Sequence, residues 1–170
     1  MTVERRRTSL VLVLAAAVVG LDQMTKTLAV RGLEFGEPVH VVGTFRLNLY
    51  LNPGGAFSIG SSFTPFFAVA AAVVVAILLL SSRRATSAGM AAALGMVVGG
   101  ATGNLVDRVL RAHDGAVIDF LDVQWWPIFN VADVFLTIGG ISLLVAGFLD
   151  ERRGGRDGSA NAEPAPADAP

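Results

Sequence analysis

The chain has 170 residues, of which 53% are hydrophobic and only 16% are charged, and its mean hydropathy is +0.60. This composition is typical of a membrane protein, and the formal net charge of −1 says little because charge placement matters more. The absence of cysteine excludes disulfides and thiol catalysis, and with two histidines a zinc site is not expected. There is no basic face, so we expect no nucleic-acid partner. There is also no phosphate-binding loop, so we expect no cofactor, and the scarcity of Cys and His leads us to expect no metal.

The N-terminal segment resembles a secretory signal but lacks its cleavage site. Three arginines, Arg5 to Arg7, precede the apolar run SLVLVLAAAVVGL. No small-x-small site follows, and the chain continues with DQMTKTLAV, which is able to complete a helix. We therefore predict an uncleaved first membrane span.

Four segments are apolar enough to cross a bilayer, whose core of about 30 Å needs roughly 20 residues of helix. The second of them has no charged residue and no polar stripe at helical spacing, which argues against a soluble bundle. The sequence predicts an all-α membrane protein with four transmembrane helices and a small extracytoplasmic β element. The predicted spans are about 9–30, 63–80, 88–110 and 131–149.

Basic residues indicate the orientation. Eight of the thirteen Lys and Arg residues lie before the first span, between the second and third, and after the fourth. Because Lys and Arg concentrate in cytoplasmic loops, we expect both termini in the cytoplasm. The loops 31–62 and 111–130 then face outward. Residues 1–150 form the membrane domain, and the tail 151–170, which has no large apolar residue, is predicted to be disordered.

Two local patterns predict further structure, one in the first outward loop and one in the third span. In TFRLNLYLN, apolar and polar residues alternate with a period of two, which indicates a half-buried strand followed by a turn at NPGG. We place the outer β element at about 39–60. In the third span, Gly95, Gly99 and Gly103 recur every four residues, a spacing that lets helix backbones approach closely.

Polar side chains gather at the outward ends of the spans, where ionisable groups are costly and usually functional. Each also has a purely structural interpretation. Asp22 and Lys26 are four residues apart and suit an ion pair. Asn130 suits a helix N-cap, and a carboxylate three residues later is favoured by the helix dipole. The polar residues in question are Asp22, Asn104, Asp107, Arg108, Asp119, Asn130 and Asp133.

Asp119 and Asp133 flank the return of the chain into the membrane, and a short excursion between them would bring their carboxyl groups together. Two close carboxyl groups do not both ionise easily, so one keeps its proton. The ionised group then takes a proton from water while the protonated group binds the substrate carbonyl. This pair is able to hydrolyse a peptide bond without a metal or a nucleophilic side chain.

Other mechanisms fit less well. Ser58 lacks a nucleophile-elbow pattern, and Lys26, the only lysine, is already close to Asp22. A small transporter or proton-linked channel is the alternative from another class, because it would also keep carboxylates and asparagines at one depth. A channel needs a polar route across the membrane, however, and the second span has no polar residue in its centre.

Five sequence blocks, in this order, resemble the bacterial lipoprotein signal peptidase family, signal peptidase II. They are DQMTK, LNPGGAFSIG, GGATGNLVDRV, AVIDFLDV and FNVADVFLTIG, and together they cover about residues 9–150. The resemblance implies a polytopic aspartic endopeptidase of the bacterial inner membrane. It would remove signal peptides from diacylglyceryl-modified prolipoproteins, cleaving before the lipidated cysteine.

The resemblance also implies roles for single residues. The catalytic pair of the family falls on Asp119 and Asp133. The segment between them is shorter than is common in the family, with Trp125 and Trp126 as expected interfacial anchors. Membrane lipids and cyclic peptide inhibitors such as globomycin are further expected partners. Residues expected to bind substrate or support the site are Asp22, Asn52, Asn104, Asp107, Arg108 and Asn130.

Overall fold

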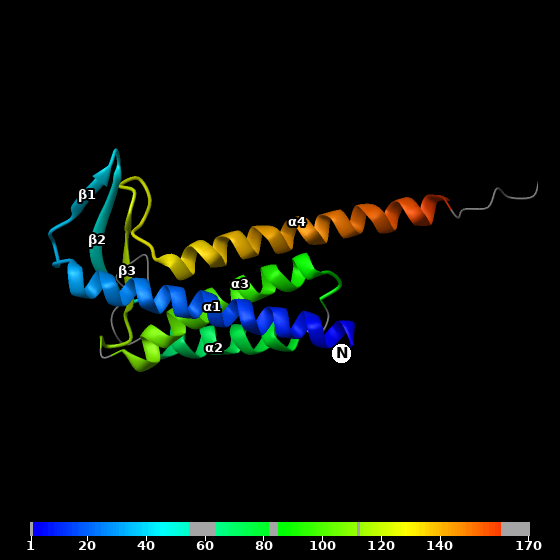
Figure 1. Cartoon of the computed structure of the whole chain (residues 1–170), viewed down its shortest axis with the longest axis horizontal. Coiled ribbons are helices and arrows are strands. Elements are labelled where there is room, and N and C mark those ends of the chain that lie inside the picture. The colour runs from blue at the N-terminus through cyan, green and yellow to red at the C-terminus, as the bar shows by residue number, and fades with distance from the viewer. Residues whose placement is uncertain (1, 55–63, 82–84, 112, 161–170) are drawn as a thin grey trace, which may run out of the picture.

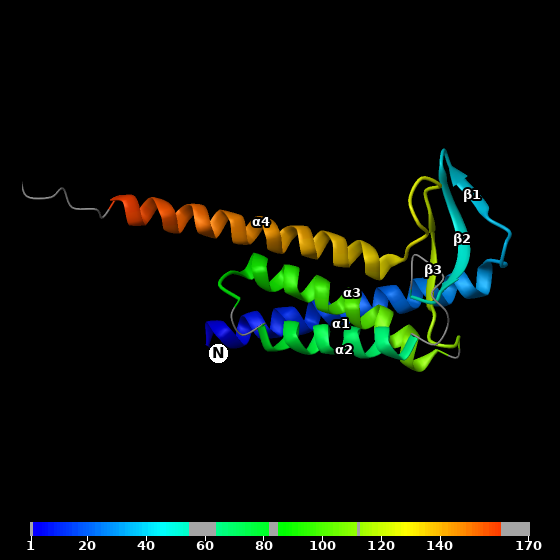
Figure 2. The same cartoon turned by 180° about the vertical axis from the view of Figure 1, so that it is seen from behind.

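The computed structural model describes residues 2–54, 64–81, 85–111 and 113–160. Figure 1 shows helices α1 to α4 running along the long axis of the molecule, with the strands gathered at one end, which we call the strand end. Figure 2 shows from behind that α4 extends beyond the other helices at the opposite end. The elements are α1 (Val3–Gly32), β1 (Val39–Val42), β2 (Phe45–Asn52), α2 (Thr64–Ser81), α3 (Ala88–Leu110), β3 (Val117–Asp122) and α4 (Val131–Ala160).

Three helices in the described part of the chain are long and apolar enough to cross a membrane. They are α1, α3 and the Val131–Phe148 portion of α4. The apolar stretch Ala68–Ser81 of α2 is shorter than these. The mostly helical architecture with a small β element is therefore confirmed, together with the length and composition of three of the four predicted spans.

The last helix differs from the prediction. α4 continues to Ala160, so residues 151–160 are helical, although we predicted disorder from residue 151. Glu151, Arg152 and Arg153 favour a helix directly after the span, but Gly154, Gly155 and Gly158 disfavour one, so local preference does not explain the continuation beyond Arg153. Residues 161–170 lie outside the described residues.

The sheet is antiparallel, in the order β1–β2–β3. β2 is the strand that the alternating pattern predicts, with Leu49 buried and its neighbour Tyr50 exposed. β3 was not predicted, because Val117 to Phe120 are all buried and show no alternation. Tyr50 lies opposite Asp119 in the pairing of β2 with β3. Asp119 thus lies on a strand of this sheet, and the chain between Asp119 and Asp133 comprises the end of β3 and the segment that joins β3 to α4.

Glycines allow α3 to pack closely against α1. A Cβ atom on Gly95 would lie 2.9 Å from the Cβ of Leu14, and one on Gly99 would lie 2.7 Å from the Cβ of Val18. Contacts this short are not possible, so both positions require glycine at the observed helix spacing. The packing role predicted from their four-residue spacing is confirmed, and α3 also packs extensively against α4.

An apolar cluster attaches the sheet to the strand end of α1. Its buried members come from α1, β2 and β3, and they are Ala29, Leu49, Ile118 and Phe120. Because apolar burial contributes about 25 cal/mol per Å², this cluster holds β3 firmly in place. Asp119 lies between Ile118 and Phe120, so the same packing determines the position of its carboxyl group.

Candidate active site

Asp119 is a buried carboxylate on β3 with a hydrogen bond to each oxygen. Its side chain is 1% exposed. Oδ1 accepts a hydrogen bond of 2.6 Å from Nδ2 of Asn130, and Oδ2 accepts one of 2.9 Å from Nδ2 of Asn52. Both donors are uncharged amides, so they orient the carboxyl group without adding a positive charge beside it.

Asp133 lies in the first turn of α4 and is half-buried. Oδ1 accepts a hydrogen bond of 2.8 Å from Nδ2 of Asn104. Oδ2 accepts one of 3.2 Å from the backbone N–H of Asn130, whose own Oδ1 accepts from the backbone N–H of Asp133 at 3.0 Å. This reciprocal pair is a capping box, which satisfies two free donors at the start of the helix.

Asn130 joins the two carboxylates. Its fully buried side chain caps α4 through Oδ1 and donates from Nδ2 to Asp119 and to Oδ1 of Asn104. The sequence left open whether Asn130 is a helix cap or part of the site. The structure shows that it is a cap and that it also holds Asp119.

The surroundings of Asp119 make it easier to protonate. Burial, which disfavours the charged form, raises the pKa of Asp119 from 3.8 to about 6, and the negative charge of Asp133 acts in the same direction. The hydrogen bonds from Asn52 and Asn130 lower the pKa and so limit this rise. Asp119 therefore gains or loses its proton near neutral pH, where a general acid is most useful.

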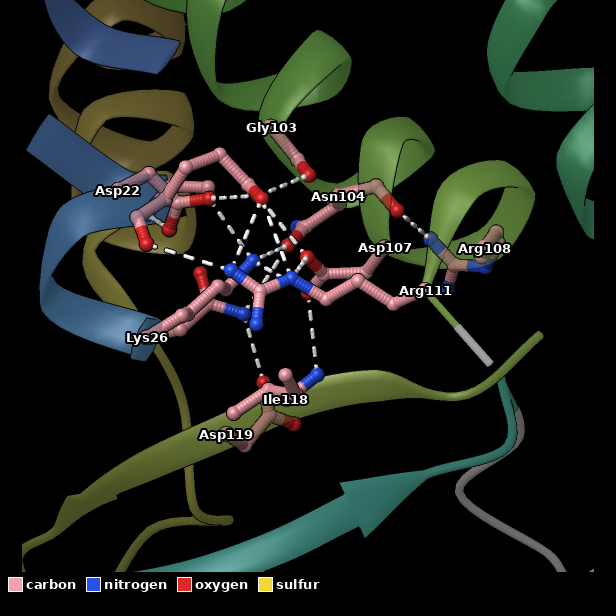
Figure 3. A network of polar contacts seen from close by, with 12 residues as sticks. Asp22, Lys26, Gly103, Asn104, Asp107, Arg108, Arg111, Ile118 and Asp119 are labelled. Atoms are coloured by element: carbon pink, nitrogen blue, oxygen red, sulfur yellow. Dashed lines mark hydrogen bonds and ion pairs between the residues drawn. The ribbon is translucent and has the colours of Figure 1, made fainter. Parts of the chain in front are cut away.

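Beside this pair lies a cluster of four charged residues, which we call the charged cluster: Asp22, Lys26, Asp107 and Arg111. The ammonium group of Lys26 is 2.9 Å from Oδ2 of Asp22 and 2.7 Å from Oδ2 of Asp107, and all three side chains are 0% exposed. Arg111 approaches Oδ1 of Asp107 at 3.3 Å. Figure 3 shows these side chains converging between α1, α3 and β3.

The charged cluster also connects the elements around it. Oδ1 of Asp22 accepts a hydrogen bond of 2.9 Å from the backbone N–H of Ala132 in the first turn of α4. Oδ2 of Asp107 accepts one of 3.1 Å from the backbone N–H of Ile118, immediately before Asp119. A Cβ atom on Gly103 would lie 2.6 Å from Oδ2 of Asp22, so glycine makes room for that carboxylate.

Arg108 contacts the backbone of its own helix rather than its sequence neighbour Asp107. Its Nη1 donates a long hydrogen bond of 3.4 Å to the backbone carbonyl of Asn104, while its Nε is buried without a hydrogen-bond partner. Asp107 instead pairs with Lys26 and Arg111. Arg108 still lies within electrostatic range of Asp119 and Asp133, so it adds positive charge near the carboxylates without a direct ion pair.

The structure brings all the predicted site residues into one connected network of hydrogen bonds and ion pairs. Sequence reasoning did not select Lys26, Gln23 or Arg111 for this network. Gln23 donates to Oδ1 of Asp107 at 2.9 Å and accepts from Arg111. The signal that points to Gln23 and Lys26 is the mostly polar stretch DQMTK inside an otherwise apolar span, with Lys26 as the only lysine in the chain; no comparable signal marks Arg111.

An apolar groove of about 450 Å³ opens beside Asp133. Two exposed tryptophans, Trp125 and Trp126, form part of its wall. The groove therefore offers an apolar binding surface directly next to one of the two carboxylates. Its lining comes from the loop before α4 and from the first turns of α4, namely Val123, Trp125, Trp126, Phe129, Asp133, Val134, Thr137 and Ile138.

Comparisons with known proteins match most of the chain to one family. The sequence model of the family described as Signal peptidase (SPase) II matches residues 14–149. A lipoprotein signal peptidase of Mycolicibacterium smegmatis is 43% identical over 168 residues, which are 94% of this chain and 71% of that protein. A lipoprotein signal peptidase of Mycobacterium avium is 46% identical over 144 residues, 82% of this chain and 79% of that protein.

Two solved structures, both described as bacterial membrane enzymes studied by the in meso method, are similar in fold. The one at 1.9 Å resolution has a TM-score of 0.72 and 30% sequence identity, and the match covers 80% of this chain and 90% of that chain. The one at 2.3 Å resolution has a TM-score of 0.73 and 28% identity, covering 93% and 94%.

Proposed function

Because the chain belongs to the signal peptidase II family, a family of membrane proteases that process prolipoproteins, we propose that Asp119 and Asp133 are its catalytic residues. The observation that carries the proposal is the arrangement around Asn130. One buried amide side chain donates to Asp119 and caps the helix that presents Asp133. Such a pair of carboxyl groups suits peptide hydrolysis without a metal.

In the active form the pair of carboxyl groups holds one proton, and that proton is on Asp119. Burial raises the pKa of Asp119 to about 6, so this form is most populated below about pH 6. Asp133, which is less buried and lines the groove, is ionised and removes a proton from the attacking water. The water oxygen bonds to the scissile carbonyl carbon as Asp119 gives its proton to the carbonyl oxygen. Collapse of the tetrahedral diol then breaks the C–N bond, and the dyad supplies the proton that the leaving amine needs.

The neighbouring residues support this chemistry without taking part in proton transfer. Asn52, Asn104 and Asn130 orient the carboxyl oxygens through their amide N–H groups. Asp22 and Asp107 hold α4 and β3 in place through backbone N–H groups. Arg108, a half-buried cation near both carboxylates, is the residue that we assign to binding the substrate backbone.

The substrate is a prolipoprotein whose lipobox cysteine carries diacylglycerol, and cleavage occurs before that cysteine. The apolar groove beside Asp133 suits the apolar residues or acyl chains next to the scissile bond. Membrane lipids surround the same region, and cyclic peptides such as globomycin would compete for the site. The family membership and this apolar surface support the assignment.

The proposed topology has four spans, with α2 as the second, in the bacterial inner membrane. Both termini lie in the cytoplasm, and the strand end with the dyad lies near the outer face, as the distribution of basic residues favours. The membrane domain comprises residues 1–150. Reporter fusions at residue 160 and within 31–62 test this orientation. An extracytoplasmic signal from residue 160 would place the dyad on the wrong side of the membrane.

The decisive experiment is cleavage of a diacylglyceryl-modified prolipoprotein by the purified protein in detergent. We expect cleavage before the modified cysteine, inhibition by globomycin, and the same rate with and without EDTA. An unmodified prolipoprotein serves as the matched substrate control and should be cleaved much more slowly. Loss of activity with EDTA, restored by zinc, would contradict the aspartic mechanism.

A further inference from the structure

Lys26 is a fully buried charged residue to which the proposed reaction assigns no step. Its ammonium group has three partners: the carboxylates of Asp22 and Asp107, and Oδ1 of Asn104 at 2.9 Å. A simple ion pair would be complete with the two carboxylates. The third contact therefore connects the charged cluster to the dyad, because Asn104 also donates to Asp133 at 2.8 Å.

The direction of these hydrogen bonds follows from the chemistry of an ammonium group. Such a group donates three hydrogen bonds and accepts none. Asn104 must therefore turn its carbonyl oxygen toward Lys26, and its NH₂ group is left to face Asp133. Oδ1 of Asn104 also accepts a hydrogen bond of 3.0 Å from Nδ2 of Asn130, which agrees with the same orientation. With the amide reversed, the carbonyl oxygen of Asn104 would face the carboxylate of Asp133 and repel it.

We propose that Lys26 is a positioning residue that fixes the orientation of the Asn104 amide and, through it, the hydrogen bond that holds Asp133. This inference rests on the proposed dyad but goes beyond it, since it assigns a role to a residue that touches neither carboxyl group of the pair. The effect of Lys26 reaches Asp133 through Asn104. If the amide group of Asn104 were reversed, its carbonyl oxygen would replace its NH₂ group as the neighbour of Asp133.

The charges around Lys26 support this role. Asp22 on α1 and Asp107 on α3 face its ammonium group, and Arg111 shares Asp107. These carboxylates compensate the positive charge of the ammonium group, which donates hydrogen bonds and accepts none. The charge of Lys26 also lowers the pKa of Asp119, so its removal makes Asp119 retain its proton to higher pH.

The test is Lys26→Met, with kcat and KM measured across a pH series on the folded fraction of the purified enzyme. We expect kcat to fall by about tenfold, a smaller loss than the roughly 10²–10⁴-fold contribution of acid–base catalysis itself. KM should change little, because Lys26 does not contact the substrate. The alkaline limb of the kcat profile should move to higher pH.

Arg111→Met is the matched control. It also removes a cation from Asp107, but Arg111 contacts Gln23 and Thr27 rather than Asn104. We expect it to reduce thermal stability while leaving the pH profile of the folded enzyme unchanged. If Lys26→Met also has a wild-type kcat and pH profile per folded molecule, Lys26 has a structural role only and the proposal is wrong.

A second variant keeps the test decisive if Lys26→Met folds poorly. Lys26→Met leaves the Asp107 carboxylate without the cation at its Oδ2, and adding Asp107→Asn removes that negative charge. The amide oxygen at position 107 is still able to accept the hydrogen bond from the backbone N–H of Ile118. A similar fall in kcat per folded molecule is expected, with a smaller movement of the pH profile because loss of the Asp107 charge opposes loss of the Lys26 charge. A wild-type kcat per folded molecule contradicts the proposal. Failure of the proposed function itself is distinguishable, because wild-type enzyme would then not cleave the modified prolipoprotein.

Discussion

Two groups of acidic side chains lie side by side at the strand end, and their charges are handled in opposite ways. In the charged cluster, Lys26 lies within 2.9 Å of both Asp22 and Asp107. Asp119 and Asp133 instead receive their hydrogen bonds from uncharged amide groups. Within the described residues, none of the ion pairs includes either member of the dyad.

This difference shows how one residue type serves two purposes within one small region. Breaking a buried pair of a carboxylate and a cation is costly, so such a pair is suited to holding helices together. A buried carboxylate held by neutral amides is oriented as well, but no cation directly opposes its protonation. The partners of an aspartate therefore help to separate the structural role of the charged cluster from the proposed catalytic role of Asp119.

The largest expected effect comes from removing either member of the dyad. Asp119→Asn and Asp133→Asn should each lower kcat by about 10³-fold or more, because a general acid or base is lost. Both proteins should fold, since asparagine fills the same space and the charged cluster is unchanged. Cleavage of the modified prolipoprotein, together with thermal unfolding in detergent, measures both properties. A folded Asp119→Asn enzyme with more than about a tenth of wild-type activity would contradict a catalytic role for Asp119. Such a loss is smaller than the usual contribution of acid–base catalysis.

The next effect is expected at Asn130, which belongs to both the helix cap and the dyad. Asn130→Asp keeps a good N-cap residue but replaces the donor to Asp119 by a third carboxylate. We expect kcat to fall by about 10²-fold with little change in thermal stability. Asn130→Ser is the control, since it keeps a capping oxygen and adds no charge, and its loss should be smaller. Near-normal cleavage by a stable Asn130→Asp protein would limit Asn130 to capping.

Much of this arrangement was predictable from the sequence. The spans follow from hydropathy, β2 from its alternation, and the close approach of α1 and α3 from glycines four residues apart. Asp119 and Asp133 are recognisable because carboxylates at a membrane boundary are costly. The cap at Asn130 follows from an asparagine three residues before a carboxylate at a helix start.

The parts that were missed depend on contacts between distant residues. β3 is buried along most of its length, so its sequence lacks the alternation by which a strand is recognised. The ion pair between Lys26 and Asp107 joins α1 to α3, and helix spacing predicts only the local pair with Asp22. Arg108 does not pair with Asp107 although the two are adjacent in sequence, because adjacent helical residues point in different directions.

The charged cluster is expected to affect stability more than chemistry. Asp107→Asn leaves Lys26 with one carboxylate instead of two, and breaking a buried ion pair costs about 3 kcal/mol. The free energy of unfolding in detergent should fall by about that amount, while kcat per folded molecule changes far less than in Asp119→Asn. Asp114→Asn, at an exposed turn, is the control, with an expected change within about 0.5 kcal/mol. A catalytic defect in a fully stable Asp107→Asn protein would contradict this separation.

The smallest effect concerns the neutral amides themselves and appears as a shift in pH dependence. In the proposed mechanism, Asp119 acts as the acid in its protonated form. Because the pKa of Asp119 is raised to about 6, chiefly by burial, kcat/KM for the wild type should decline as the pH rises through about 6. The hydrogen bond from Asn52 lowers the pKa of Asp119, so Asn52→Ala should move this decline to higher pH.

A second asparagine on β2 provides the matched control for that shift. Asn48 donates to Asp122 at 3.2 Å instead of to Asp119, so Asn48→Ala should leave the alkaline limb where it is in the wild type. Measuring kcat/KM from about pH 5 to about pH 9 for the three proteins separates the outcomes, because this range brackets the alkaline limb. If Asn52→Ala and Asn48→Ala both match the wild type, the amide at Asn52 does not tune the proton on Asp119. If both variants move the alkaline limb equally, the shift reflects a general change in the sheet. The hydrogen bond from Asn52 would then have no specific effect on the pKa of Asp119.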